Sequence, residues 1–324
     1  MSPAGVREEP PAGDKPPPYG EHLVNAYAPT DTRTVFSLDL LVNAIIAGVL
    51  LGGFYAAVSL GISLTFGLLD VVNIAHPVFV ILSSYAVYVM NNSFGWDPLL
   101  TGILCTPVFF VIGVVVYQIY YGSFEKKGEA SLRGLVFFFG LLFIIQVALL
   151  LQFGVDYRMI EATYVGRSIR FGEIGIALRL LVPCLVGLGM TVALHFFLSR
   201  TFYGRAIMGV SQDSLALRLM GADPVRIKTI AFGIGIATAG LAGALLIMIA
   251  PNEPSTAYDY IGRIFAIAVL GGMGNIGGTL AAAMILGVAE SLMSTFSGPS
   301  WSLAVSFGIL LLVLAVRPAG LFGR

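Results

Sequence analysis

Charged residues are scarce in this sequence. Asp, Glu, Lys and Arg make up 11% of the 324 residues, whereas hydrophobic residues make up 57%. Soluble globular domains do not have this composition, because so few charges cannot cover a water-facing surface. The formal net charge is zero, which also leaves no electrostatic argument for a nucleic-acid partner. The composition therefore indicates an integral membrane protein that binds no nucleic acid.

The residues needed for nucleotide, redox or metal chemistry are also missing. A Walker A phosphate-binding loop requires a Gly-Lys pair, and the sequence contains none. Cys105 and Cys184 lie in or beside apolar runs, outside any CxxC or Cys/His cluster, which favours a packing role. We expect no catalytic residue, no metal site and no cofactor bound by this chain. Energy for any transport must come from another subunit or from an ion gradient.

Long charge-free segments predict membrane-spanning helices. Five segments without Asp, Glu, Lys or Arg each reach or approach the roughly 20 apolar residues that cross a bilayer. These segments are Leu40–Phe66, Leu99–Tyr121, Gly134–Leu151, Ile230–Ala250 and Trp301–Val316. Less clean spans are Leu180–Leu198, Ile264–Ala289 and Pro77–Met90. The fold class is therefore all-α and polytopic, with about eight transmembrane helices.

The distribution of Lys and Arg predicts the orientation. If the loops after Tyr121 and Leu198 and the C-terminus face the cytoplasm, that side carries ten positive residues and the other side five. The N-terminal end is then on the external side. Residues 1–36 are rich in Pro and charge without an apolar core, so we expect a disordered tail and no cleavable signal peptide. Residues 37–324 are expected to form a single transmembrane domain.

Polar residues interrupt the apolar pattern after the first predicted helix. Asp70, Asn73 and His76 precede Pro77, which suits the first turn of a new helix. We favour a hydrogen bond that closes this break over direct substrate contact for His76. For Asp70, a helix cap or an interfacial position is favoured.

A glycine-rich string forms the second interruption. Gly271, Gly272 and Gly274 precede Asn275, and only seven apolar residues separate the string from Arg263. A half-helix, a glycine turn and a return helix would fit, and such a re-entrant segment would line the transport pathway. Close helix packing is an equally weighted interpretation. The predicted substrate-pathway residues are Asn73, His76, Gly271, Gly272, Gly274 and Asn275. Glu290, further along, is expected at a solvated helix end.

The loop 199–229 contains helix signals. Ser211 is predicted to begin a lateral helix of about ten residues, with Asp213 in its first turn and Gly221 at a left-handed end. Asp223 and Pro224 then predict the start of the next membrane helix. Leu215, Leu219 and Met220 lie on or near one side of the lateral helix. Such a helix could lie on lipid or dock into a groove of a partner protein.

The string Gly204–Gly221, GRAIMGVSQDSLALRLMG, resembles the cytoplasmic loop of LivH-type permeases, the membrane subunits of branched-chain amino acid ABC importers. Other matching strings are NAIIAGVLLGGFYAAVSLGISLTFGLLDVVNIAH, AVLGGMGNIGGTLAAAMILGVAE and VRPAGLFG. The resemblance covers nearly all of Ser37–Arg324. Family members usually place glycine after the histidine of the first string, whereas Pro77 follows His76 here.

The resemblance implies a non-enzymatic permease that forms half of an amino-acid pathway in the bacterial inner membrane. It implies a second, LivM-like permease, two ATP-binding cassette subunits similar to LivG and LivF that bind ATP and Mg, and a periplasmic solute-binding protein. The loop would be the coupling helix on the ATPase, and its residues would be Arg205, Ser211, Asp213, Leu215, Arg218, Leu219 and Gly221. Urea, amides or small organic acids are alternative substrates. An ion-coupled secondary transporter is less favoured, because the helices carry so few charges; a membrane-embedded enzyme is the least favoured class.

Overall fold

The computed structural model describes residues 38–127, 130–160, 162, 164, 166–171, 174–317 and 320–323. The chain divides into two units, residues 1–37 and Leu38–Arg324, and the description below concerns the second. The tail 1–36, which we expect to be disordered, lies outside the described residues.

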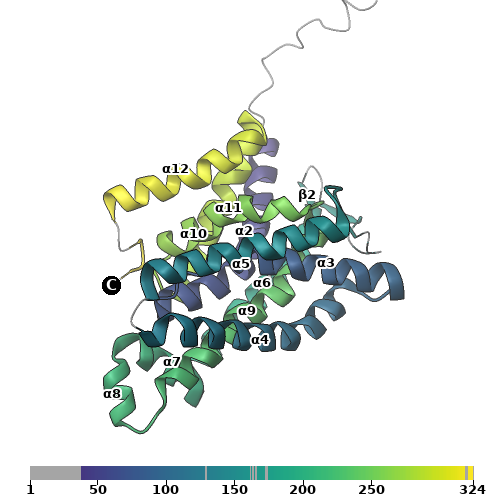
Figure 1. The fold of residues 1–324 in the computed structure, drawn as a ribbon. Coiled ribbons are helices and arrows are strands. Elements are labelled where there is room, and N and C mark those ends of the chain that lie inside the picture. The colour runs from purple at the N-terminus through teal and green to yellow at the C-terminus, as the bar shows by residue number, and fades with distance from the viewer. Residues whose placement is uncertain are drawn as a thin grey trace, which may run out of the picture. The chain divides into compact units, whose positions relative to one another are not determined.

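Helices dominate the described residues (Figure 1). Eleven α-helices occur there: α2 (Leu38–Leu69), α3 (His76–Phe94), α4 (Pro98–Ser123), α5 (Ala130–Phe153), α6 (Leu178–Arg200), α7 (Phe202–Gln212), α8 (Ser214–Leu219), α9 (Pro224–Ile249), α10 (Ala257–Leu270), α11 (Ile276–Ser297) and α12 (Ser300–Val316). Short 3-10 turns are η3 (Glu125–Lys127) and η4 (Pro254–Thr256). One antiparallel hairpin, β1 (Ser168–Phe171) with β2 (Ile174–Ala177), precedes α6. The all-α class is thus confirmed, apart from this hairpin.

Six of the described helices are long and apolar enough to cross a membrane. They are α2, α4 with its η3 extension, α5, α6, α9 and α11. Helix α12 is apolar but shorter, with 17 residues. Helix α3 coincides with the less clean span Pro77–Met90 and falls outside the six. The span Ile264–Ala289 divides between the end of α10 and most of α11, and only α11 is among the six. A polytopic membrane protein is therefore confirmed, whereas the number of about eight crossings stays a prediction.

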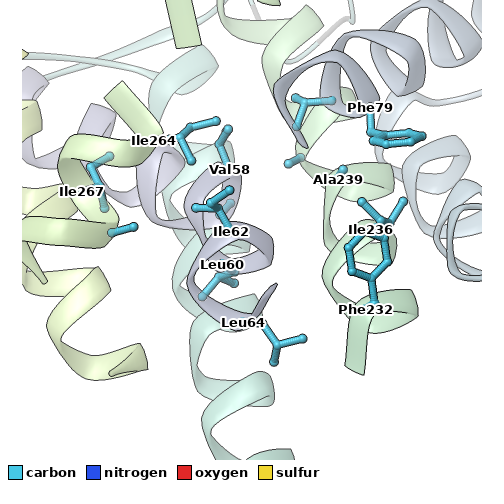
Figure 2. Packing of buried hydrophobic residues seen from close by; sticks show 14 of the residues in the cluster. Val58, Leu60, Ile62, Leu64, Phe79, Phe232, Ile236, Ala239, Ile264 and Ile267 are labelled. Carbon is cyan, nitrogen blue, oxygen red and sulfur yellow. The ribbon is translucent and has the colours of Figure 1, made fainter. Parts of the chain in front are cut away.

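Helix α2 lies at the centre of the hydrophobic core. Figure 2 shows its side chains Val58, Leu60, Ile62 and Leu64 between those of α10 on one side and those of α9 and α3 on the other. Small residues bring α2 close to its neighbours. A Cβ atom added to Gly287 of α11 would lie 2.5 Å from the Gly48 carbonyl oxygen of α2. Such backbone-to-backbone packing is typical of helices in membranes.

Candidate functional site

The break after α2 is made by a left-handed residue. Helix α2 ends at Leu69, and Asp70 then has a φ angle of 55°, which is uncommon for a residue other than glycine. Asp70 is exposed and does not cap α3, whose N-cap position is held by Ala75. Pro77 lies in the first turn of α3, as predicted. The sequence thus locates the break correctly, and the chain reverses through residues 70–75.

His76 is fully buried and folds back onto α2. Its Nε2 lies 3.0 Å from the Val58 carbonyl oxygen. Because a carbonyl only accepts, Nε2 donates this hydrogen bond and Nδ1 is unprotonated in the neutral ring. The ring fits here because Gly61 has no side chain; an added Cβ would come within 2.2 Å of His76 Cε1. His76 therefore forms a hydrogen bond across the break, the role that we favour over substrate contact. Its partner lies 18 positions earlier in the chain, within α2.

Asn73 is also fully buried, and both polar atoms of its side-chain amide lack a hydrogen-bond partner among the described residues. His76 Nδ1 shares this property. A buried polar group without a partner costs about 1–3 kcal/mol. The break thus contains three polar atoms that a water molecule, a solute or another conformation of the chain would satisfy.

The glycine turn joins α10 to α11. Gly271 ends α10, and Gly272 and Gly274 both have φ angles of 79°, which favour glycine. Asn275 begins α11 by accepting a hydrogen bond from the Gly278 amide at 3.0 Å. The 14 residues of α10 extend about 21 Å, less than a hydrocarbon core of about 30 Å. The short helix, turn and return helix are present, and their re-entrant course stays a prediction.

Close packing explains most of these glycines. A Cβ on Gly274 would lie 2.8 Å from the Gly67 carbonyl oxygen of α2, and one on Gly271 would lie 2.7 Å from the backbone of Gly278. A Cβ on Gly272 would come within 2.4 Å of the Gly323 nitrogen. The close-packing interpretation is therefore confirmed, and a side chain in the turn would displace backbone.

Residues 320–323, which we call the C-terminal strap, cover the glycine turn. The Leu321 amide donates to the Leu270 carbonyl oxygen at 2.8 Å. Asn275 Nδ2 donates to the Phe322 carbonyl oxygen at 3.2 Å. The same asparagine thus caps α11 with its oxygen and holds the strap with its nitrogen. The VRPAGLFG string, which contributes to the family resemblance, thereby acquires a structural role.

A cavity of about 510 Å³ borders the turn and the strap. Its lining comes from the turn, the strap and the ends of α2, α6 and α7: Leu68, His195, Leu198, Ser199, Met208, Ser211, Gln212, Met273, Gly274, Asn275, Ile276, Phe322 and Gly323. Asn73 and His76 do not line it, and no hydrogen bond among the described residues joins them to residues 271–275. The two predicted pathway groups are therefore separate sites in this conformation.

The loop 199–229 contains two helices and not the single one that we expect from Ser211. Helix α7 continues through Ser211, whose hydroxyl donates to the Met208 carbonyl oxygen at 2.8 Å. Asp213 then caps α8 by accepting from the amides of Leu215 and Ala216 at 2.8 and 2.9 Å. At a helix N-terminus, a carboxylate is a stronger hydrogen-bond acceptor than a serine hydroxyl. Its negative charge also interacts favourably with the positive end of the helix dipole. The predicted start at Ser211 was therefore wrong, and α8 has six residues.

The end of α8 and the start of α9 follow the prediction. Gly221 has a φ angle of 82°, the left-handed conformation expected after a helix. Asp223 accepts a hydrogen bond from the Val225 amide at 3.0 Å, and Pro224 is the first residue of α9. In Figure 1, α7 and α8 lie beside each other at one end of the drawing.

The side chains of α8 divide into one buried leucine and a group of exposed apolar residues. Leu217 is 7% exposed and fastens α8 to the bundle. Leu215 is 65% exposed, Leu219 82% and Met220 76%; we call these three residues the α8 apolar surface. The polar coupling residues Arg205, Ser211, Asp213 and Arg218 are exposed as well. Apolar side chains at such exposure favour a surface that another molecule covers.

An ion pair ties the start of α9 to the loop that follows α4. Lys228 Nζ lies 2.7 Å from Glu125 Oε1, and both side chains are about one-fifth exposed. The Tyr117 hydroxyl donates to the other Glu125 oxygen at 2.8 Å. The segment after α8 is therefore anchored to α4 and η3 by charge and not by packing alone. Local sequence patterns do not reveal this pair, because its partners lie 103 positions apart.

Glu290 is not at a solvated helix end, as we expect from the sequence, but is 2% exposed. It accepts hydrogen bonds from the Tyr55 hydroxyl at 2.5 Å and from Arg263 Nε at 3.0 Å. Ser306 of α12 donates to it as well. Because the partners come from three other helices, α2, α10 and α12, the carboxylate joins four helices at one point. A charge with such partners is stable at this depth, which the local sequence cannot reveal.

Comparison with known proteins identifies the family. A family described as "Branched-chain amino acid transport system / permease component" matches residues 44–314. The chain belongs to this family. The LivH permease protein of Escherichia coli (strain K12) is 29% identical over 293 residues, which cover 86% of this chain and 94% of the relative. The BraD permease protein of Pseudomonas aeruginosa is 29% identical over 303 residues, which cover 89% and 96%.

A second type of relative matches part of the permease. The LivM permease protein of Salmonella typhimurium is 34% identical over 150 residues, which cover 44% of this chain and 34% of the relative. No solved structure matches the chain. The LivH-type resemblance is thus confirmed, and the protein is a permease of the branched-chain amino acid ABC transport family and not an enzyme.

Proposed function

We propose that the permease forms half of the translocation pathway of an ABC importer for branched-chain or other hydrophobic amino acids. The α8 apolar surface carries this proposal. The chain has no Gly-Lys pair for a nucleotide site, so energy from ATP must enter through a contact with another subunit. Leu215 and Leu219 would provide the buried anchors of that contact, and Arg218 and Arg205 its polar rim.

The proposed assembly contains a second, LivM-like permease, two ATP-binding cassette subunits similar to LivG and LivF, and a periplasmic solute-binding protein. Relatives named LivH and LivM support the pairing of two permeases, since both are described as parts of a high-affinity branched-chain amino acid transport system. ATP and Mg would bind to the cassette subunits, which close and move α8. The Asp223–Pro224 joint would pass this movement to α9.

The proposed location is the bacterial inner membrane, with α7, α8 and the C-terminus in the cytoplasm and the N-terminal end in the periplasm. The excess of Lys and Arg in the loops after α4 and α6 favours this orientation. Residues of α7 and the C-terminal strap line one cavity, so both belong to the same end of the bundle. The same orientation therefore puts α7 and the C-terminus on the cytoplasmic side together.

The proposed solute path passes the break at Asn73 and His76 and the turn formed by Gly271, Gly272, Gly274 and Asn275. The unpartnered amide of Asn73 supports this path, because a solute or water would satisfy it. The 510 Å³ cavity at the turn supports it as well. Since Asn73 and His76 are fully buried, the path requires a second conformation in which α2 and α3 separate at the break.

Reconstitution tests the function. The permease is assembled with its partner permease and both cassette subunits in liposomes, and uptake of radiolabelled leucine, isoleucine and valine is measured with loaded binding protein. Uptake that needs internal ATP supports the proposal. Uptake of urea, amides or small organic acids in place of leucine would select the alternative substrates. Uptake driven by an ion gradient without ATP would instead make the chain a secondary transporter.

A further inference from the structure

A second cavity, of about 250 Å³, lies beside the Glu290 cluster. Its wall is amphipathic: Ala47, Leu51 and Leu180 are apolar, whereas Arg263, Glu290 and hydroxyl groups such as that of Ser294 are polar. We call this cavity the ion-pair pocket. The larger cavity at the glycine turn has no Asp, Glu, Lys or Arg in its lining. Of the two cavities, the ion-pair pocket is therefore the one that offers both charges to a ligand.

The two charges of this pocket are buried and mutually compensated. The Arg263 side chain is 15% exposed and that of Glu290 is 3% exposed. Arg263 Nε donates to both oxygens of Glu290, at 3.0 and 3.3 Å, and Nη1 lies 3.5 Å from the Asp259 carbonyl oxygen. Arg263 Nη2 has no hydrogen-bond partner among the described residues. A guanidinium with free donors is well suited to a carboxylate.

We propose that the ion-pair pocket binds an aliphatic amino acid as its zwitterion during passage through the permease. The ligand carboxylate would accept hydrogen bonds from Arg263 Nη2, and its ammonium would lie toward Glu290 and the Ser294 hydroxyl. The aliphatic side chain would contact Ala47, Leu51 and Leu180. This inference rests on the proposed function and specifies where that function recognises its substrate.

Three properties of the pocket favour this ligand. A zwitterion is neutral overall, so it enters beside a neutral ion pair without leaving a net buried charge. The volume of about 250 Å³ suits a small solute, since pockets for larger ligands begin at about 300 Å³. The apolar and polar parts of the wall match the two parts of an aliphatic amino acid. Urea, which has no aliphatic part and no charge, could hydrogen-bond to the polar part but would leave the apolar part unused.

Protection of a cysteine from modification tests binding directly. The assembled transporter carries Ser294→Cys, with Cys105→Ala and Cys184→Ala to remove the native thiols. Labelling by a charged methanethiosulfonate is then timed with and without L-leucine. We expect labelling to slow about tenfold at a leucine concentration about ten times the dissociation constant. Leucinamide and 4-methylpentanoate, which each lack one charge, should protect much less.

A cysteine at Ser93 is the matched control. Ser93 is exposed at the end of α3 and does not line the pocket. Its labelling rate should not change with leucine, which excludes a general closing of the transporter. Equal labelling of Ser294→Cys with and without saturating leucine would overturn the proposal. Equal protection by all three compounds would overturn recognition of the zwitterion.

Filling the pocket provides a second measurement that leaves the ion pair intact. Ala47→Phe places a ring against the apolar wall, whereas Val49→Phe, on the same helix, adds the same ring at an exposed position. We expect Ala47→Phe to lower leucine uptake at least tenfold with normal subunit assembly, and Val49→Phe to retain uptake. Normal uptake by Ala47→Phe would contradict the proposal.

The proposed function and the ion-pair pocket can be refuted separately. A transporter that moves leucine with ATP but shows neither protection nor an effect of Ala47→Phe retains the proposed function and loses the ion-pair pocket. A transporter that moves no leucine and shows no protection of Ser294→Cys, while its subunits assemble, refutes both the proposed substrate and the ion-pair pocket.

Discussion

The α8 apolar surface gives a quantitative prediction for the double variant Leu215→Asp, Leu219→Asp. Burial of a whole leucine side chain is worth about 1.5–3 kcal/mol. With 65% and 82% of these side chains exposed, burying both in a partner would contribute about 2–4 kcal/mol. Losing that contribution weakens association roughly 30- to 1,000-fold. A buried carboxylate would weaken it further.

The assay measures retention of the cassette subunits on the purified permease together with ATP-dependent uptake. The variant should insert normally and keep its thermal stability, because both leucines are exposed in the isolated permease. Arg218→Ala is the control, since an exposed charge at an interface rim contributes at most about 1 kcal/mol. If the double variant keeps its partner and its transport, docking occurs elsewhere. The loop Gly122–Arg133 would then be the next candidate.

Three further predictions concern stability, each measured as thermal unfolding of the permease in detergent. Glu290→Ala should lower the free energy of unfolding by about 3–5 kcal/mol, because it leaves the Arg263 charge buried without its partner; an unchanged melting temperature would contradict the described cluster. Gly61→Ala should cost about 1–3 kcal/mol, since its Cβ would clash with the histidine ring, whereas Gly189→Ala, in open space, should cost nothing. Asn275→Ala should cost about 0.5–2 kcal/mol through the lost cap of α11, and Asn275→Asp, which keeps the accepting oxygen, should cost less.

Local signals in the sequence predicted several features correctly. Asp223 and Pro224 gave the start of α9, because a carboxylate cap and a proline in the first turn act through neighbouring amides only. Gly221 marks the end of α8 for an equally local reason, because glycine readily adopts the left-handed conformation that ends a helix. Charge-free length likewise predicted most of the long helices, since a bilayer-spanning segment must satisfy its own backbone.

The errors arose where two local signals competed or where partners are distant. Ser211 and Asp213 both suit an N-cap, and the carboxylate prevailed while the serine stayed inside α7. The buried position of Glu290 depends on partners 235, 27 and 16 positions away, so the local sequence predicts a solvated helix end instead. Hydrophobic periodicity contains no information about such pairs. The closed environment of His76 likewise depends on Gly61, which only the packing of α2 against α3 brings beside it.

The C-terminal strap has a consequence for the order of biosynthesis. Asn275 and Phe322 are 47 positions apart, so α10 and α11 are synthesised before the residues that cover their turn. During that interval the Leu270 carbonyl oxygen lacks the Leu321 amide, and the turn lacks the backbone that fills the space beside Gly272. The turn is therefore among the last parts of the permease to reach its final packing. A chain that stops before residue 320 would leave the turn without this cover.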